Sequence, residues 1–183
     1  SDSRPLQIAC FLSHLLAIKN ALDKFNDEIF LILEDDAILF PDPILVGLKN
    51  AIDNKDWEIL QLEHNNPTTF QRSINLYNKG VLLHRWHPLD TGCGSYLIRR
   101  KFAESLINYF FENQKLDLKK CYQIDGEIAS DQIFYDIAKT LVFTFPISYQ
   151  DLDFTSQIGY EFSIMKFRRD SLELVKNLWK KYI

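Results

Sequence analysis

Residues 30–37 read FLILEDDA, an apolar run that ends in three consecutive acids, Glu34, Asp35 and Asp36. A short apolar run of this kind is typical of a buried strand, so the acids are expected at its carboxyl end, where open α/β sheets bind ligands. Three adjacent carboxylates repel one another, and a hard divalent cation with oxygen ligands offsets that repulsion. The pattern therefore indicates either a metal or substrate site or an exposed acidic turn before Pro41.

The composition is that of a globular protein with one domain. The chain has 183 residues, of which 46% are hydrophobic and 14% aromatic, enough for a substantial core. Its 21 basic and 25 acidic side chains give a net charge of -4, which argues against a protein that coats nucleic acid. We therefore expect no nucleic-acid partner.

The cysteines favour a reducing compartment. Cys10, Cys93 and Cys121 are odd in number, widely spaced and without a C-x-x-C pattern, so they indicate neither a disulfide framework nor a thiolate zinc site. The N-terminus lacks the features of a signal peptide, and no apolar stretch approaches 18 residues without a charge. A cytoplasmic location is expected.

Helical and strand-like patterns alternate along the chain. Helices are predicted over 8–25, 41–52, 102–111 and 131–138, and strands over 30–33, 57–62, 81–84, 96–98 and 141–145. Such alternation favours an α/β fold with a mostly parallel sheet covered by flanking helices. No linker or internal repeat divides the chain, so residues 1–183 are expected to form a single domain.

The order of several short motifs resembles glycosyltransferase family 25, the lipooligosaccharide and collagen galactosyltransferase family. The pair formed by CFLSHL at 10–15 and LILEDD at 31–36 carries most of the resemblance. It continues through GSYLI at 94–98 with Ala103, then SDQ at 130–132, Pro146, Gln150 and TSQI at 155–158. The resemblance implies a GT-A-like fold and a hexosyltransferase.

Members of this family usually open with an apolar strand and a basic segment well before the Ser-His motif, and both are absent from this sequence. In the GT-A fold that the resemblance implies, that first strand helps to hold the nucleotide. The expectation is a domain that is truncated or divergent at its N-terminus, and that binds its donor weakly.

The resemblance also implies roles for the acidic run. Transfer from a nucleotide sugar needs Mn²⁺ or Mg²⁺ to offset charge on the leaving diphosphate, with Asp36 as the first candidate ligand. Asp35 would contact the donor ribose or sugar, and Glu34 would act through water. Ser13 and His14 of the Ser-His motif are further donor-binding candidates, although a buried histidine with satisfied hydrogen bonds is the alternative for His14.

An inverting transfer needs a carboxylate base for the acceptor hydroxyl, and Asp131 is the candidate. Its position at a predicted helix N-terminus is equally compatible with an N-cap, and Asp125 and Glu127 are nearby rivals. Gln132 beside it is a candidate acceptor contact.

Trp86, His87 and Asp90 are candidate acceptor-binding residues, because aromatic and polar groups on a loop can stack on a sugar. The glycines that follow are alternatively ordinary turn residues. The basic amphipathic tail over 166–183 predicts either peripheral contact with an anionic inner membrane or a helix packed on the domain.

The sequence thus predicts a metal-dependent inverting glycosyltransferase that moves a hexose, galactose from UDP-galactose, to a saccharide or lipid-linked glycan. The alternative is a catalytically silent carbohydrate-binding or scaffold domain with the same fold. A metal-dependent hydrolase is a more distant alternative.

Overall fold

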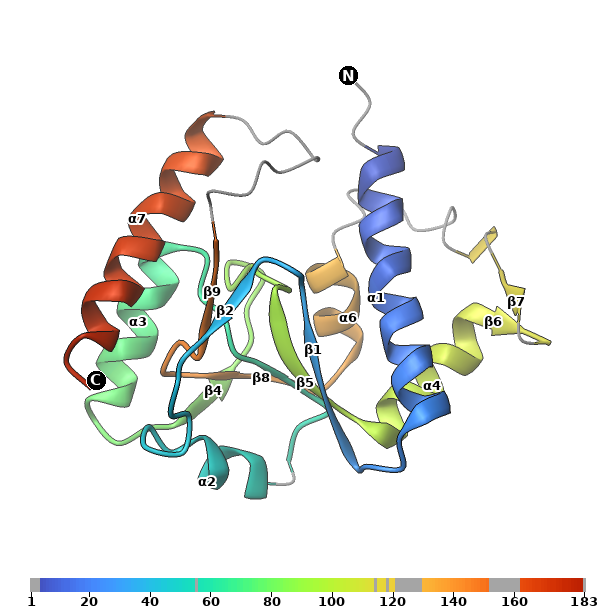
Figure 1. The fold of residues 1–183 in the computed structure, drawn as a ribbon, viewed down its shortest axis with the longest axis horizontal. Helices are drawn as coiled ribbons and strands as arrows, with labels where there is room; N and C mark the ends of the chain where they lie inside the picture. The colour runs from blue at the N-terminus through green and yellow to red at the C-terminus, as the bar shows by residue number, and fades with distance from the viewer. Residues whose placement is uncertain are drawn as a thin grey trace.

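A computed structural model describes residues 4–54, 56–113, 115–117, 119–120, 130–151 and 162–182. Its main sheet has five strands in the order β1-β5-β3-β8-β4 (Figure 1). These are β1 (Ile29–Leu33), β3 (Ile59–Gln61), β4 (Leu83–Arg85), β5 (Ser95–Arg99) and β8 (Thr140–Phe143). Each coincides with a strand-like run in the sequence, so the existence of the five strands was correctly predicted.

The sheet is mixed, and the prediction of a mostly parallel sheet is wrong. β3 and β8 are parallel, whereas β1 with β5, β3 with β5, and β4 with β8 are antiparallel. The physical reason is the insertion of β5 between β1 and β3, which run in the same direction and are both paired with it. Alternation of helices and strands gives no information about such an insertion. The fold class is therefore α/β with a mixed sheet.

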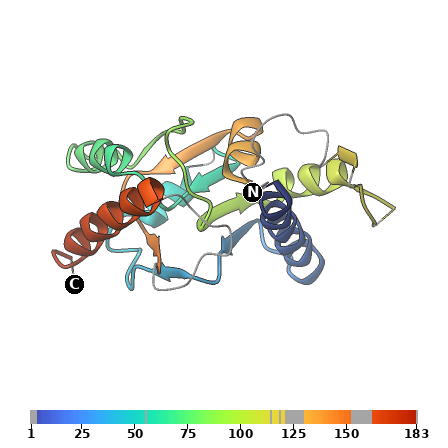
Figure 2. The ribbon, with the colours of Figure 1, turned by 90° about the horizontal axis from the view of Figure 1, so that it is seen from above.

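One face of the sheet is covered by α1 (Arg4–Lys24), α4 (Arg100–Phe110) and α6 (Ser130–Ile137). Their apolar side chains form one core with alternate strand residues of the sheet. Figures 1 and 2 show α1 and α4 at one end of the molecule. The core on this face includes Ile8, Phe11, Leu15, Ile18, Phe30, Ile32, Ile59, Tyr96, Ile98, Leu106, Phe110 and Phe134.

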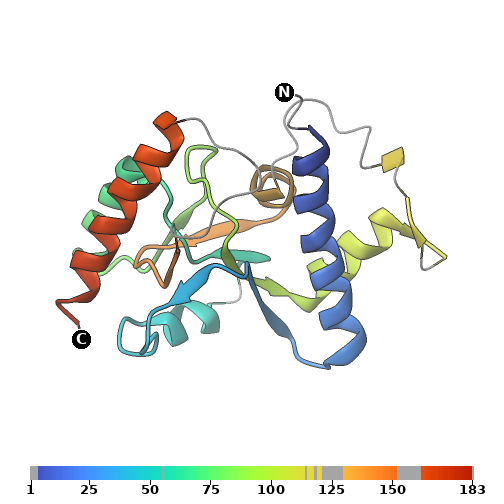
Figure 3. The same cartoon turned by 45° about the horizontal axis from the view of Figure 1, so that its top comes forward.

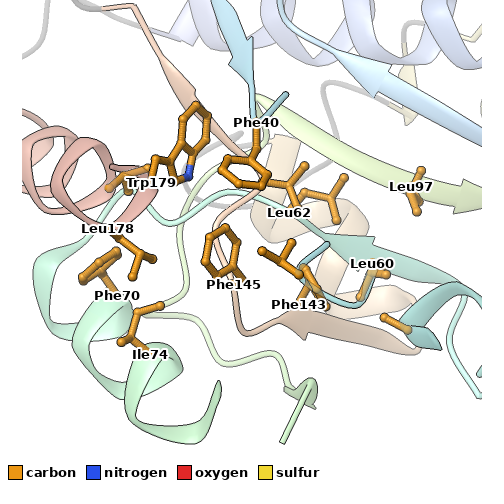
Figure 4. Packing of buried hydrophobic residues seen from close by; sticks show 14 of the residues in the cluster. Phe40, Leu60, Leu62, Phe70, Ile74, Leu97, Phe143, Phe145, Leu178 and Trp179 are labelled. Atoms are coloured by element: carbon orange, nitrogen blue, oxygen red, sulfur yellow. The ribbon is translucent and has the colours of Figure 1, made fainter. Parts of the chain in front are cut away.

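The opposite face carries α2 (Leu48–Asp53), α3 (Pro67–Tyr77) and α7 (Phe162–Trp179). Figure 4 shows the side chains of α3 and α7 meeting those of β3 and the segment after β8. The labelled members of this second core are Phe40, Leu60, Leu62, Phe70, Ile74, Leu97, Phe143, Phe145, Leu178 and Trp179. Because β3 is central, Ile59 faces one core and Leu60 the other, so both are fully buried.

A small two-stranded ribbon extends the sheet at the acidic end of β1. It pairs β2 (Ala37–Leu39) antiparallel with β9 (Ser148–Gln150), with Ala37 opposite Gln150. A second ribbon joins β6 (Phe111–Glu112) to β7 (Lys115–Leu116). The first ribbon matters for function, because it brings Gln150 beside the acids that follow β1. Figure 3 shows β2 following β1 after a sharp turn of the chain.

Helix α3 was not predicted, although the sequence carries a clear signal for it. Asn66 caps the helix, its side-chain oxygen accepting a hydrogen bond of 2.9 Å from the Thr68 amide, and Pro67 occupies the first turn. Asn followed by Pro is a typical helix start, because proline lacks the amide hydrogen that the first turn leaves unpaired.

Helix α1 is long and apolar enough, by length and composition alone, to cross a membrane. In the fold, Phe11, Leu15 and Ile18 are fully buried against the sheet, as in the core helix of a globular domain. The apolar character of α1 is therefore accounted for in part by packing.

Candidate functional site

The candidate site lies at the ends of β1 and β3, which flank β5 and are each followed by an acid. β1 and β3 run in the same direction with β5 between them, so Glu34 and Glu63 both lie beside the start of β5. The Glu34 amide donates to the Gly94 carbonyl at 2.9 Å, and the Leu62 amide donates to the Ser95 carbonyl at 3.2 Å. The topology thus brings together two acids that are 29 residues apart in the sequence.

Glu34 has partners on both carboxylate oxygens. Its Oε1 lies 3.3 Å from His14 Nε2 and accepts from Cys93 Sγ at 3.3 Å. Its Oε2 accepts from the side-chain amide of Gln150. Burial would raise the pKa of Glu34, but the hydrogen bond and charge of His14, the Cys93 thiol and the charge of Arg168 together lower it. Glu34 is therefore ionised and held on both sides.

His14 is buried, only 4% exposed, and both ring nitrogens have partners. Nδ1 lies 3.2 Å from the Tyr96 hydroxyl, and the two rings are stacked with centroids 5.8 Å apart. Burial alone would lower the pKa of His14, but Cys10 and Glu34 raise it to about 9. His14 is thus packed in the way expected of a core histidine with satisfied hydrogen bonds, and its ring also contacts the acidic run.

Asp36 lies on the turn between β1 and β2, with Asp35 exposed beside it. Burial and the negative charges of Glu34 and Asp35 raise the pKa of Asp36. The Gln150 amide reaches Asp36 Oδ1 at 3.5 Å as well as Glu34, and the Asp151 amide donates to the Asp36 carbonyl at 2.8 Å. The acidic run is therefore neither a fully exposed turn nor fully buried. It borders the protein interior and is held by β9.

Glu63 is the second acid of the site, and only 1% of it is exposed. Neither of its carboxylate oxygens has a hydrogen-bond partner among the described residues. Burial, followed by the negative charge of Glu34, raises the pKa of Glu63 to about 8, although the positive charge of Arg168 and the Gly94 backbone oppose this. At neutral pH Glu63 is therefore mainly an uncharged carboxylic acid.

Further buried polar atoms without partners among the described residues gather at the same end of the sheet. A cavity of about 10 Å³ beneath α7 is lined in part by His64, Gln150, Arg168 and Ser171, which is room for about one water molecule. Orphaned buried polar groups are rare in folded proteins because each costs about 1–3 kcal/mol. They belong to Gln61, Glu63, His64, Gln150 and Ser171. Their concentration at this end of the sheet makes it the candidate functional site.

The other predicted residues lie in varied surroundings. Ser13 is exposed on α1, and its hydroxyl donates back to the Cys10 carbonyl at 2.7 Å. Asp90 is 1% exposed and forms an ion pair with Arg72, while its second oxygen accepts from the His87 amide at 2.9 Å. Both carboxylate oxygens of Asp90 are therefore occupied, one by Arg72 and one by the His87 amide, so neither is free to bind a ligand in this arrangement.

Trp86 packs its ring edge-on against Tyr135 at 5.9 Å and donates from Nε1 to the Asp90 carbonyl at 2.9 Å. The Trp86 backbone amide donates a hydrogen bond to the carbonyl of Thr140, and Thr140 pairs with Ile59 at the start of β3. Trp86 is thus placed at the opposite end of β3 from Glu63.

Asp131 and Gln132 lie in the first turn of α6, and their side chains are outside the described part of the structure, as are Asp125, Glu127 and residues 155–158. The proposed roles of these residues stay predictions.

The sequence alone did not assign Glu63 or Arg168 to the site. It also gave Gln150 no role there. A signal for Glu63 exists, because the strand-like stretch at 57–62 is followed by an acid just as the apolar run at 30–33 is. For Arg168 there is no comparable local signal, since its effect on Glu34 depends on where α7 packs.

Comparisons with known proteins identify the family of this chain. The model of glycosyltransferase family 25, described as an LPS biosynthesis protein, matches residues 5–125. No curated protein matches significantly. Among solved structures, A197 from STIV is similar over 79% of this chain and 68% of its own, at 14% identity and a TM-score of 0.48. The family match spans well over half of the chain and includes both α1 and the acidic run, so this protein belongs to glycosyltransferase family 25.

Proposed function

We propose that this protein is a metal-dependent, inverting glycosyltransferase of lipopolysaccharide biosynthesis that transfers galactose from UDP-galactose to a saccharide or lipid-linked glycan. The observation that carries the proposal is the convergence of Glu34 and Asp36 on the Gln150 amide in a chain of family 25. That arrangement collects negative charge at one edge of the protein.

The residues present fit a hard divalent cation. Asp36 holds its proton more strongly than usual because it is partly buried and has two acidic neighbours, so a cation at this position relieves a repulsion that the fold maintains. Carboxylate oxygens are the donors that Mg²⁺ and Mn²⁺ prefer. Asp36 would bind the ion, and exposed Asp35 is available to the donor ribose or sugar. The ion would offset the charge of the leaving diphosphate.

His14 and Gln150 then have positioning roles. Because His14 contacts one oxygen of Glu34 and Gln150 donates to the other, the carboxylate keeps one orientation beside the turn that carries Asp36. Arg168 adds a positive charge that acts on both acids. The donor site is thus preorganised rather than assembled on binding.

The acceptor hydroxyl attacks the anomeric carbon as the bond to the diphosphate breaks, and a carboxylate base takes the hydroxyl proton. We assign this base to Asp131, with Gln132 and His87 as acceptor contacts, and leave out Trp86 because it lies at the opposite end of β3 from Glu63. A base at this step is worth about 10²–10⁴-fold in rate. Asp131→Asn is therefore expected to lower turnover by that factor and to leave UDP affinity within about threefold.

Peripheral membrane contact on the cytoplasmic side suits a lipid-linked acceptor. Three apolar residues of α7, Val175, Leu178 and Trp179, are packed in the core and are each less than 10% exposed. Its basic residues Lys166, Arg169 and Lys180 are exposed and available to anionic lipid. Sedimentation with anionic and with neutral vesicles tests this part of the proposal.

Calorimetric titration with UDP in the presence and absence of Mn²⁺ tests the donor site. The wild-type chain is expected to bind UDP only with the metal, and Asp36→Asn is expected to lose this binding. Asp27→Asn, which neutralises an exposed aspartate outside the acidic run, is the matched control. Mass spectrometry of glycan products with a panel of nucleotide sugars identifies the donor. If neither variant nor wild type binds any nucleotide sugar, the silent scaffold is the better account.

A further inference from the structure

Three side chains of different chemistry converge on the inner side of the acidic run. Cys10 and His14 are one helical turn apart on the same face of α1, and Glu34 follows β1. The thiol sulfur, an imidazole nitrogen and a carboxylate oxygen all lie within 4.8 Å of one another. Asp36, the candidate ligand for the hard cation, is not a member of this group. The cluster therefore shares His14 and Glu34 with the surroundings of the proposed donor site but does not include Asp36, its candidate metal ligand.

The spacing between two of these atoms is compatible with a metal site as well as with an ion pair. His14 Nε2 and Glu34 Oε1 are 3.3 Å apart. A charge-assisted hydrogen bond between such groups is usually about 2.7–2.9 Å long. Two ligands that each lie about 2.0–2.1 Å from a tetrahedral zinc ion are about 3.3 Å apart. An ion fits between the two atoms without their moving further apart.

The surroundings hold the ligands as outer-shell groups do in metal proteins. The second ring nitrogen of His14 lies 3.2 Å from the Tyr96 hydroxyl, and the fully buried Tyr96 ring stacks on the imidazole. The second oxygen of Glu34 accepts from Gln150. Metal-binding histidines and carboxylates are typically fixed by such second contacts, which orient the ligand atoms.

The charges also favour a cation. As ligands, the deprotonated thiol of Cys10 and the carboxylate of Glu34 would bring two negative charges to a partly buried site, and a divalent ion would neutralise both. Among divalent ions, a sulfur and nitrogen donor set selects zinc over Mg²⁺ or Mn²⁺, whereas the oxygen donors of Asp36 favour the reverse. The two sites therefore need not compete for one metal.

We propose that Cys10, His14 and Glu34 bind a zinc ion, with water in the fourth position. The ion fixes α1 to the end of β1 and so orients Glu34 behind the donor site. This inference depends on the geometry of the cluster and not on the proposed transfer reaction. The sequence pattern alone does not point to this site, because the Cys-x₃-His pair gains its third ligand only in the fold.

The test is metal titration of the full chain after chelation and reduction. Zinc is measured by competition with a chromophoric chelator, and Co²⁺ serves as a spectroscopic probe. We expect one equivalent of Co²⁺ with tetrahedral visible bands and a thiolate-to-cobalt charge-transfer band in the near ultraviolet. Zinc is expected to displace the cobalt and to raise the melting temperature. A wild-type chain that takes up no equivalent of Co²⁺ with a thiolate band overturns the proposal.

Variants identify the ligands. Cys10→Ser is expected to abolish the charge-transfer band, and His14→Gln to weaken zinc binding more than about 100-fold, since loss of even an outer-shell partner costs about 10–100-fold. Tyr96→Phe is expected to fall within that outer-shell range. His87→Gln removes an exposed imidazole and is the matched control. Loss of the band in Cys93→Ser together with its retention in Cys10→Ser contradicts the assignment.

Discussion

Gly94 lies directly against the buried carboxyl group of Glu63. A Cβ at position 94 would meet Glu63 Oε2, would lie 3.1 Å from Glu63 Cδ, and would lie 3.2 Å from Gln150 Cγ. The Gly94 carbonyl meanwhile accepts the Glu34 amide at 2.9 Å. The glycine therefore separates the two acids of the site, and its lack of a side chain leaves the space that Glu63 occupies.

Gly94→Ala is expected to destabilise the protein by about 1–3 kcal/mol, because the added methyl group overpacks a rigid site. For a chain of this size each kcal/mol lowers the melting temperature by about 2–4 °C. Urea unfolding of Gly94→Ala, Glu63→Ala and the double variant gives the coupling between the two positions. If the losses in unfolding free energy of the two single variants add up to that of the double variant, the added methyl group does not contact the Glu63 carboxyl group.

Glu63 gives stability a dependence on pH that Glu63→Gln removes. Its pKa is about 8 in the folded protein against an ordinary value of 4.5, so the native state binds more protons between these values. The contribution of Glu63 to the free energy of unfolding is therefore greatest below pH 4.5 and is lost as the pH rises through 8. The slope is at most about 1.4 kcal/mol per pH unit.

The free energy of unfolding of Glu63→Gln, relative to wild type, is accordingly expected to increase between pH 5 and pH 8. Glu173→Gln, at an exposed position, is the control and should show no such trend. A constant difference between Glu63→Gln and wild type across this range would mean that Glu63 is ionised throughout.

His64 acts in the opposite direction. Its Nε2 donates to the Phe143 carbonyl at 3.0 Å, and burial, followed by the positive charge of His84, lowers its pKa from 6.5 to about 3. Since the unfolded chain binds more protons between these values, stability rises with pH up to 6.5 and is lost as pH falls toward 3.

His64→Gln, which keeps a donor for Phe143, is expected to cost more stability at pH 7 than at pH 4.5. Urea unfolding at the two pH values measures the difference. An equal cost at both would assign the acid sensitivity to other groups.

Arg99 is expected to stabilise the fold without taking part in donor binding. Its guanidinium lies 4.1 Å from the centroid of the Trp57 ring and donates to the carbonyls of Trp57, Ile52 and Asn54 at 2.8, 3.3 and 3.0 Å. Arg99→Lys loses the planar set of donors, and we expect a loss of about 1–3 kcal/mol in unfolding free energy. UDP affinity should be unchanged, and a large fall in that affinity would instead make Arg99 a phosphate ligand. Lys101→Ala, at an exposed position, is the control.

Local sequence determined the five strands of the main sheet and most of the helices, because burial on a strand or a helix face imposes a short-range period. The apolar run before Glu34 predicted β1 and its acidic end. The motifs around His14 and Glu34 also identified the family, which the match over residues 5–125 confirms. The short strands β2 and β9, of which β9 ends in Gln150, have too few residues to show a period and were not predicted.

The tertiary structure alone decided the order of the strands and the membership of the site. Insertion of β5 between β1 and β3 makes the sheet mixed and places Gly94 between Glu34 and Glu63. Packing of α1 on this sheet brings His14 to Glu34. These contacts join residues that are far apart along the chain, and their energies depend on how whole faces pack, which no local pattern of residues encodes.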